Sequence, residues 1–302
     1  MKNFSVLHKN FSLKYANKVK GKNKLSVISF FSGAGGASLG YKWAGYNVVA
    51  ANEFVKSAAN IYRDNHKETI LYECDIRTLS PKQLLKDLKI KKGELDLMDA
   101  SPPCEFFSAN TAFIQEDRIG KTVEYKPGYH QRIDDLFDYT IDMLKGLKPK
   151  TFVFENVAGM VKTDYSKQKL NNYLGLMRNA GYVVKYAILD GSLLGIPQKR
   201  ERVIIVGVRK DLGVAPCFPK PLKPMYIKDV FPNIAYYFVR DCHSNVVTKK
   251  PANTTSFRTI MSSAATKKLN INQVRNPYHV EEVSGINRNI TLMEAQISTG
   301  YP

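Results

Sequence analysis

The sequence of 302 residues has few cysteines, a single tryptophan and no long apolar run. Its four cysteines lie far apart without a C-x-x-C pair, which argues against a disulfide framework and against a cysteine-based zinc site. No stretch approaches the roughly 18 uninterrupted apolar residues of a membrane-spanning helix, and the N-terminus lacks the apolar segment of a secretory signal. These absences predict a soluble intracellular protein without a metal or a membrane partner, in which at least one cysteine is free to act as a nucleophile.

Acidic residues are scarce beside basic ones, and the imbalance is concentrated in two segments. The chain has 45 lysines and arginines against 27 acidic residues, a formal net charge of +18. Residues 1–24 contain seven lysines and no acidic residue, whereas residues 209–268 contain eleven basic residues, three aspartates and interleaved aromatic residues. The first segment alone is typical of a solvated tail. The second suits a polyanionic partner, with nucleic acid as the first candidate.

The rest of the chain has the pattern of an α/β protein with a sizeable core. Short apolar runs alternate with glycine turns and amphipathic stretches, which indicates a doubly wound sheet of about seven strands within residues 25–209. We expect strands at 25–31, 46–51, 95–99, 151–155, 183–189 and 203–208, and helices at 34–44, 54–65, 81–88, 129–147 and 167–180. Several prolines between residues 216 and 232 interrupt this pattern, so a smaller basic module begins near residue 210.

A glycine-rich turn, SGAGG at residues 32–36, lies between the first predicted strand and helix. Such a turn lets a ligand approach the backbone at the carboxyl edge of a sheet, although a glycine turn alone is more often only a turn. The next two predicted strands end at Glu53 and Asp75, which could accept hydrogen bonds from a ribose and from an adenine amino group. Three such strand ends in succession indicate a cofactor of the adenosine type.

Three further motifs also adjoin predicted strands. Cys104 follows two prolines in SPPCEFFS, Glu155 ends the strand of FENV, and Arg200 and Arg202 alternate in QKRERV, which predicts that the two arginines share one strand face. Taken singly, each motif also has an explanation without function: Cys104 as a buried thiol, Glu155 as a helix-capping or ion-paired acid, and the arginines as a solvated basic strand. Their joint occurrence, in this order, favours a site.

The ordered motifs FFSGAGG, ANE, CDI, SPPCEFFS, FENV and QKRERV resemble those of the DNA (cytosine-5)-methyltransferases over residues 25–209, with a weaker match at residues 288–302. The resemblance implies a Rossmann-like α/β methyltransferase fold that uses S-adenosylmethionine, with a mostly parallel, doubly wound sheet of about seven strands. It implies a basic tail at 1–24, a catalytic domain at 25–210 and a small basic target-recognition domain at 211–302.

The resemblance also implies roles for individual residues and no metal. Phe31 would stack on the adenine of S-adenosylmethionine, the glycines of the turn would admit its methionine part, Glu53 would hold the ribose, and Asp75 with Ile76 would hold the adenine edge. The implied cofactor-binding residues are Phe31, Gly33, Ala34, Gly35, Gly36, Glu53, Phe54, Asp75, Ile76, Pro103 and Leu136. The implied catalytic residues are Cys104, Glu155, Arg200 and Arg202, and the product from the donor is S-adenosylhomocysteine.

The chemistry of cytosine requires such a set independently of the resemblance. Carbon 5 is too weak a nucleophile to take a methyl group until a thiolate, here Cys104, adds at carbon 6. An acid at N3, here Glu155, and a cation near O2 stabilise the charge that develops on the ring. The base must also be flipped out of a duplex or offered single-stranded. Methylation of an exocyclic amine needs no thiol at the position of Cys104.

Two alternatives remain beside DNA methylation: cytosine methylation of transfer RNA, and a noncatalytic or split-subunit homologue that binds DNA. Family members normally continue past the GYP-like motif at residues 300–302 into a segment that completes the cofactor pocket. The expected partner is double-stranded DNA, and either a second polypeptide supplies the missing segment or the chain is truncated. The expected setting is a restriction-modification system in the cytoplasm of a prokaryote or phage host, associated with the nucleoid.

Overall fold

The computed structural model describes residues 24–103, 122–126, 129–240, 247–258 and 279–289, together with Lys18 and Lys22. These residues form two compact units. The larger unit takes the described chain up to Ile188 together with Arg202–Phe218, and the smaller unit takes Leu189–Glu201 and the described residues from Pro219 onward.

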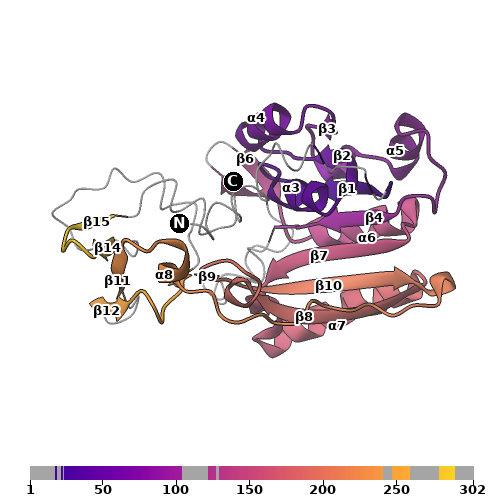
Figure 1. The fold of residues 1–302 in the computed structure, drawn as a ribbon. Helices are drawn as coiled ribbons and strands as arrows, with labels where there is room; N and C mark the ends of the chain where they lie inside the picture. The colour runs from indigo at the N-terminus through magenta and orange to yellow at the C-terminus, as the bar shows by residue number, and fades with distance from the viewer. Residues whose placement is uncertain are drawn as a thin grey trace. The chain divides into compact units, whose positions relative to one another are not determined.

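A seven-stranded sheet in the order β3-β2-β1-β4-β7-β10-β8 is the centre of the fold (Figure 1). Its strands are β1 (Ser26–Phe30), β2 (Asn47–Asn52), β3 (Ile70–Tyr72), β4 (Leu97–Ala100), β7 (Thr151–Val157), β8 (Tyr182–Asp190) and β10 (Glu201–Arg209). The pairs β1–β2, β1–β4, β2–β3 and β4–β7 are parallel, and β10 runs antiparallel to β7. The prediction of a mostly parallel, doubly wound α/β sheet is therefore confirmed. Because β1, β2, β3, β4 and β7 are parallel, their carboxyl ends meet at one edge.

Helices connect the parallel strands, as the sequence pattern predicts. They are α3 (Gly36–Trp43), α4 (Lys56–Asn65), α5 (Pro81–Asp87), α6 (Leu136–Leu147) and α7 (Asp164–Asn179), with 3-10 turns η1 (Ile76–Thr78), η4 (Ala158–Val161), η5 (Gly191–Leu193) and η6 (Lys210–Leu212). Local sequence explains several of their ends. Thr163 and Ser166 form a capping box at the start of α7, and Pro81 occupies the first turn of α5, where its missing N–H is not needed.

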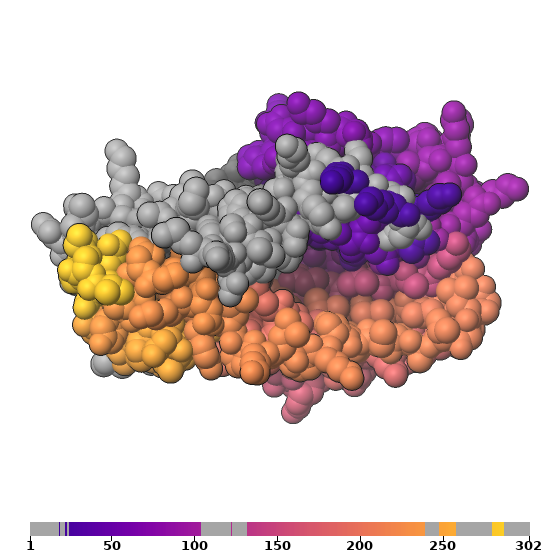
Figure 2. Space-filling view, in the orientation of Figure 1, coloured from indigo at the N-terminus to yellow at the C-terminus, as the bar shows by residue number. Residues whose placement is uncertain are grey.

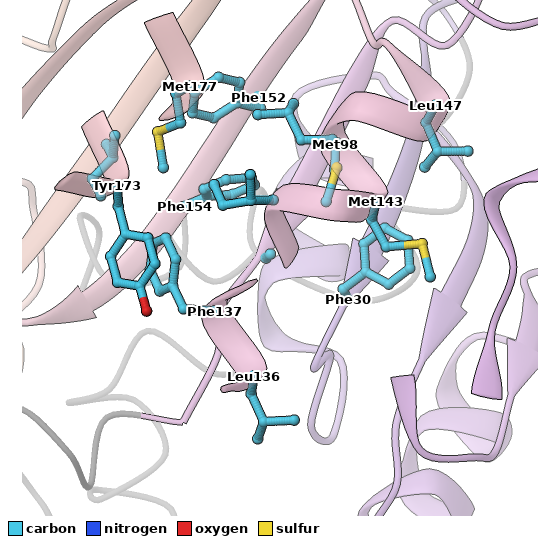
Figure 3. Close-up of a cluster of buried hydrophobic side chains, with 14 of the residues drawn as sticks. Phe30, Met98, Leu136, Phe137, Met143, Leu147, Phe152, Phe154, Tyr173 and Met177 are labelled. Carbon is cyan, nitrogen blue, oxygen red and sulfur yellow. The ribbon is translucent and has the colours of Figure 1, made fainter. Parts of the chain in front are cut away.

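The main core lies between one face of the sheet and helices α6 and α7 (Figure 3). Phe152 and Phe154 of β7 are stacked with ring centroids 4.5 Å apart, and Phe137 of α6 stacks on Tyr173 of α7 at 4.2 Å. Gly207 of β10 pairs with Phe152, whose ring takes the space that a Cβ at Gly207 would need. A larger residue at Gly207 would therefore displace the ring at the centre of this core.

The smaller unit has a separate core. Its four-stranded sheet has the order β12-β11-β14-β15 and consists of β11 (Ile234–Arg240), β12 (Val247–Pro251), β14 (His279–Glu282) and β15 (Asn287–Asn289). Helix α8 (Ile227–Val230) packs its buried residues with Tyr237 and Phe257, and β13 (Phe257–Arg258) pairs with β9 (Gln198–Lys199). On β12, Lys249 lies 4.1 Å from the centroid of the Tyr236 ring and pairs with Glu281 at 2.7 Å.

Two local predictions are wrong. The helix predicted at 129–147 begins only at Leu136, because Tyr129–Arg132 form strand β6, which pairs antiparallel with β5 (Thr122–Lys126). Arg200 and Arg202 do not share a strand, since Arg200 lies between β9 and β10, which belong to different sheets. After β10, most of residues 210–224 are exposed, along the orange surface in Figure 2.

Candidate active site at the carboxyl edge of the sheet

The glycine-rich turn leaves β1 in an unusual backbone conformation. Phe31, a bulky residue, has φ +54°, and Gly33 and Gly35 have φ +56° and +96°. A positive φ at a non-glycine residue costs about 1–3 kcal/mol and persists only where the surroundings impose it. Two hydrogen bonds hold the turn, because the Ser32 N–H donates to the Asn52 carbonyl and the Gly35 N–H to the Ser32 carbonyl, both at 3.0 Å. No atom of the described residues lies within 4 Å of where a Cβ at Gly33 would be, so that part of the chain leaves open space beside the turn.

Glu53, directly after β2, ties this turn to its neighbour. Its side chain is only 8% exposed. The Gly33 N–H donates to Glu53 Oε2 at 2.8 Å and the Val55 N–H donates to Oε1 at 2.7 Å. A carboxylate has about four acceptor positions, so these two bonds orient the group and leave acceptor capacity toward the turn. Ala34 and Phe54 are half-buried next to this contact, and Gly36 is exposed at the start of α3.

Asp75 belongs to an ion-pair network that sequence analysis did not identify. Its carboxylate accepts from the Arg77 N–H at 3.0 Å and from Arg77 Nη1 at 2.9 Å. Arg77 Nη2 also pairs with Asp135, directly before α6. Ile76 and Leu136, the residues that follow these two acids, are buried in the main core, and Leu136 is labelled in Figure 3. Arg77 thus joins two chain segments to which the family resemblance assigns cofactor contacts.

Glu155 and Arg202 form an ion pair on neighbouring strands. Arg202 Nε lies 2.8 Å from Glu155 Oε1, and their side chains are 20% and 34% exposed, respectively. In the β7–β10 register Arg202 is opposite Val157, so the pair is diagonal across the two strands. Arg200 belongs to the smaller unit, where its backbone N–H donates to Asp190 at 3.2 Å.

Cys104 lies outside the described residues, but the chain is described up to Pro103. Ser101 Oγ donates to the Phe31 carbonyl at 3.1 Å, and Asn156 Nδ2 donates to the buried Pro102 carbonyl at 3.3 Å. The segment that precedes Cys104 is therefore held between the ends of β1 and β7. Pro103 itself is half-buried.

Asp99 of β4 is a buried carboxyl on the same sheet face as Glu155. It lies beside Val153, and Glu155 is the next residue of β7 on that face. Ser29 Oγ donates to Asp99 Oδ2 at 2.6 Å and the Tyr41 hydroxyl donates to Oδ1 at 3.1 Å. Burial raises the pKa of Asp99 to about 6, and the charge of Glu155 adds to the increase while the two hydroxyl donors oppose it.

This pKa predicts a pH-dependent stability difference between the wild type and Asp99→Asn. Because the folded pKa is raised, the native state holds a proton that the unfolded state releases, so the Asp99 contribution is lost as pH rises from about 4 to about 7. We expect the wild type to lose about 3 kcal/mol relative to the variant over this interval. Urea unfolding of both proteins across the pH range measures it. The exposed Asp142→Asn serves as a control, and a difference for Asp99→Asn that does not vary with pH would contradict the assignment.

The described part of the site thus brings together the ends of β1, β2, β4 and β7. Its members are Phe31, the glycine turn, Glu53, Pro103, Glu155 and Arg202. Among the described residues no group of three or more His, Cys, Asp or Glu side chains is placed to hold a metal ion. Within the same residues, no helix has the length and apolar composition that a membrane crossing requires.

The chain is similar to known methyltransferases in both sequence and fold. The type II methyltransferase M.NgoPII of Neisseria gonorrhoeae is 33% identical over 203 residues, which are 66% of this chain and 52% of that protein. A crystal structure of a putative DNA modification methyltransferase encoded within an E. coli prophage has 25% identity and a TM-score of 0.55, covering 72% of this chain and 58% of that one. The structure of a Spodoptera frugiperda DNMT2 mutant, with 22% identity and a TM-score of 0.51, covers 70% of this chain and 62% of that one and supports the fold alone.

The chain spans about half the length of the curated relatives that it matches. The family model for C-5 cytosine-specific DNA methylase nevertheless matches residues 25–300, almost the whole chain. This match includes the six ordered motifs from FFSGAGG to QKRERV. The chain belongs to the C-5 cytosine-specific DNA methylase family.

Proposed function

We propose that the protein transfers a methyl group from S-adenosylmethionine to carbon 5 of cytosine in double-stranded DNA. One observation carries the proposal. An open glycine turn, hydrogen-bonded to Glu53, lies at the same sheet edge as the Glu155–Arg202 ion pair. The first group of residues suits a nucleoside with a charged amino acid tail. The second suits a pyrimidine that must be held and made electrophilic.

The turn has the features that S-adenosylmethionine requires. The space beside Gly33 would admit the methionine part, and the free acceptor positions of Glu53 would bind the ribose hydroxyls. Helix α3 has Gly35 at its N-cap position, no side-chain cap and no acidic residue in its first turn, so its N-terminal N–H groups favour a carboxylate. When bound, the donor supplies an electrophilic methyl group and leaves as S-adenosylhomocysteine.

The remaining residues would act on the base. The Cys104 thiolate forms a bond to carbon 6 of cytosine, while Glu155 holds a proton at N3 and Arg202 places a positive charge beside the ring. Carbon 5 then takes the methyl group. Loss of the carbon 5 proton breaks the bond to sulfur and restores both the aromatic ring and the thiolate. Arg200, a short distance along the chain, is proposed to help bind the base or the adjacent phosphate.

We further propose that residues 211–302 contact the DNA around the target base, which is flipped out of the helix. Type II methyltransferases are among the relatives of this chain, so a restriction-modification role in the cytoplasm, on nucleoid DNA, follows as part of the proposal.

One experiment tests the reaction and the substrate together. The purified chain is incubated with methyl-labelled S-adenosylmethionine and either double-stranded DNA or transfer RNA, and the methylated base is identified by mass spectrometry. We expect 5-methylcytosine in DNA. Methylation of transfer RNA alone would show that RNA, and not DNA, is the substrate. Methylation of an exocyclic amine would overturn the mechanism. Donor binding without turnover would favour the noncatalytic or split-subunit alternative.

The role of Glu53 predicts a loss of cofactor affinity in Glu53→Gln. The amide keeps the size of the side chain but loses the charge and one acceptor, so the dissociation constant for S-adenosylmethionine should rise roughly 10- to 100-fold. Calorimetric titration measures this. Glu73→Gln, an exposed change in an ion pair with Arg63, is the matched control. Equal affinities of wild type and Glu53→Gln would show that Glu53 does not bind the donor.

A further inference from the structure

A buried histidine contacts the glycine turn from the end of the following helix. His66 is 2% exposed and follows the last residue of α4. Its Nε2 lies 3.1 Å from the Gly35 carbonyl oxygen, and its Nδ1 lies 2.9 Å from Nζ of Lys42, which is 3% exposed on α3. Neither His66 nor Lys42 belongs to the motifs that carry the family resemblance.

The chemistry of these three groups determines which ring nitrogen carries the proton. A lysine ammonium group only donates hydrogen bonds, so Nδ1 of His66 must accept from Lys42. In the neutral ring the proton is then on Nε2, which donates to the Gly35 carbonyl. Burial, followed by the Lys42 charge, lowers the pKa of His66 to about 4, so the ring is neutral at neutral pH.

The ring also leaves no space beside Gly35. A Cβ at Gly35 would lie 2.2 Å from His66 Nε2 and 3.0 Å from Tyr62 Cδ2. The rings of Tyr62 and His66 are 4.5 Å apart, and the Tyr62 hydroxyl lies 2.9 Å from Ser38 Oγ of α3. The imidazole is therefore held from α3, α4 and the turn together.

The Gly35 carbonyl has a second hydrogen bond, from the Leu39 N–H at 2.9 Å, which is the first turn of α3. Loss of the His66 bond would thus leave this carbonyl still paired within the helix. The main effect of losing this bond would therefore be a change in the orientation of the turn and of the first N–H groups of α3, rather than the free energy of an unpaired buried carbonyl. These are the groups to which the donor binds under the proposed function.

We propose that His66 is a positioning residue for S-adenosylmethionine binding: its Nε2–H holds the Gly35 carbonyl, and Lys42 selects the tautomer that makes this possible. The inference rests on the proposed function, because it assigns the donor to this turn. The hydrogen bonds from Lys42 to His66 and from His66 to Gly35 hold the turn in its binding conformation before the donor arrives. The conformational entropy of the turn is then not lost on binding, which makes the binding free energy more favourable.

Two substitutions at His66 separate the two hydrogen bonds. In His66→Gln the amide nitrogen lies as many bonds from Cα as Nε2 does and can donate to Gly35. In His66→Asn the shorter side chain reaches only the Nδ1 position beside Lys42. We expect His66→Asn to raise the dissociation constant for S-adenosylmethionine about 5- to 10-fold and His66→Gln to stay within about 3-fold of wild type. The affinity for DNA should not change in either variant. A general loss of structure would lower the DNA affinity as well, so this measurement separates the two explanations.

Nitrogen-15 NMR of the wild type provides a test that does not require a variant to fold. At neutral pH the His66 ring should be neutral with its proton on Nε2, and Lys42→Met should allow the other tautomer to appear. A proton on Nδ1 in the wild type would overturn the inference, as would wild-type donor affinity in His66→Asn. A wild type that binds no S-adenosylmethionine would instead overturn the proposed function, and this inference with it.

Discussion

Replacing Cys104 with alanine is expected to abolish methyl transfer and to leave the affinity for S-adenosylmethionine close to that of the wild type. Under the proposed mechanism the thiolate acts on carbon 6 of the base, whereas the proposed donor site lies at the ends of β1 and β2. Without a nucleophile at carbon 6, carbon 5 has no electron pair with which to take the methyl group. Methyl transfer to DNA and calorimetric donor binding are measured on the same preparation.

A matched control for Cys104→Ala is Cys217→Ala, because Cys217 is a free, exposed cysteine of the larger unit. The control should keep full activity. DNA that contains 5-fluorocytosine gives a further test, since fluorine cannot leave carbon 5 as a proton does and the adduct should persist on the wild type alone. Methyl transfer to DNA by Cys104→Ala would contradict the covalent mechanism.

Replacing Glu155 with glutamine is expected to lower kcat by about 10²- to 10⁴-fold, with a much smaller change in donor affinity. Glutamine keeps the shape of the side chain but cannot hold a transferable proton at N3, so the negative charge that develops on the ring is no longer neutralised. The variant also leaves Arg202 without the carboxylate that lies 2.8 Å from its Nε in the wild type. Single-turnover rates with saturating DNA measure the effect on the chemical step.

Glu94→Gln is the control for this prediction, because Glu94 is exposed and lies before β4, at the opposite edge of the sheet from Glu155. It should retain the wild-type rate. A rate for Glu155→Gln within a few-fold of wild type would mean that another group protonates N3. In that case the Glu155–Arg202 pair would have a structural role only.

Only the tertiary structure determines the contacts that connect the sequence motifs of the candidate site. The Arg77–Asp135 and His66–Gly35 pairs join residues 58 and 31 positions apart, and no pattern within either segment indicates a partner at that distance. The burial of Asp99 likewise depends on Ser29 and Tyr41, which come from another strand and from a helix. Sequence analysis therefore missed Arg77, His66, Lys42 and Asp99, although each lies close to a residue that it selected.

The amino-acid sequence by itself determined the α/β alternation, the seven-stranded sheet, the glycine turn and the family. These features depend on local periodicity and on motifs that each lie within a few residues, so a single chain segment contains the information. The antiparallel direction of β10, the hairpin of β5 and β6, the separation of Arg200 from Arg202 and the hydrogen-bond partners of Glu53 and His66 were decided only by the tertiary structure. Strand neighbours and side-chain partners depend on which distant surfaces pack together, and the free energy of that packing is shared among segments rather than contained in any one of them.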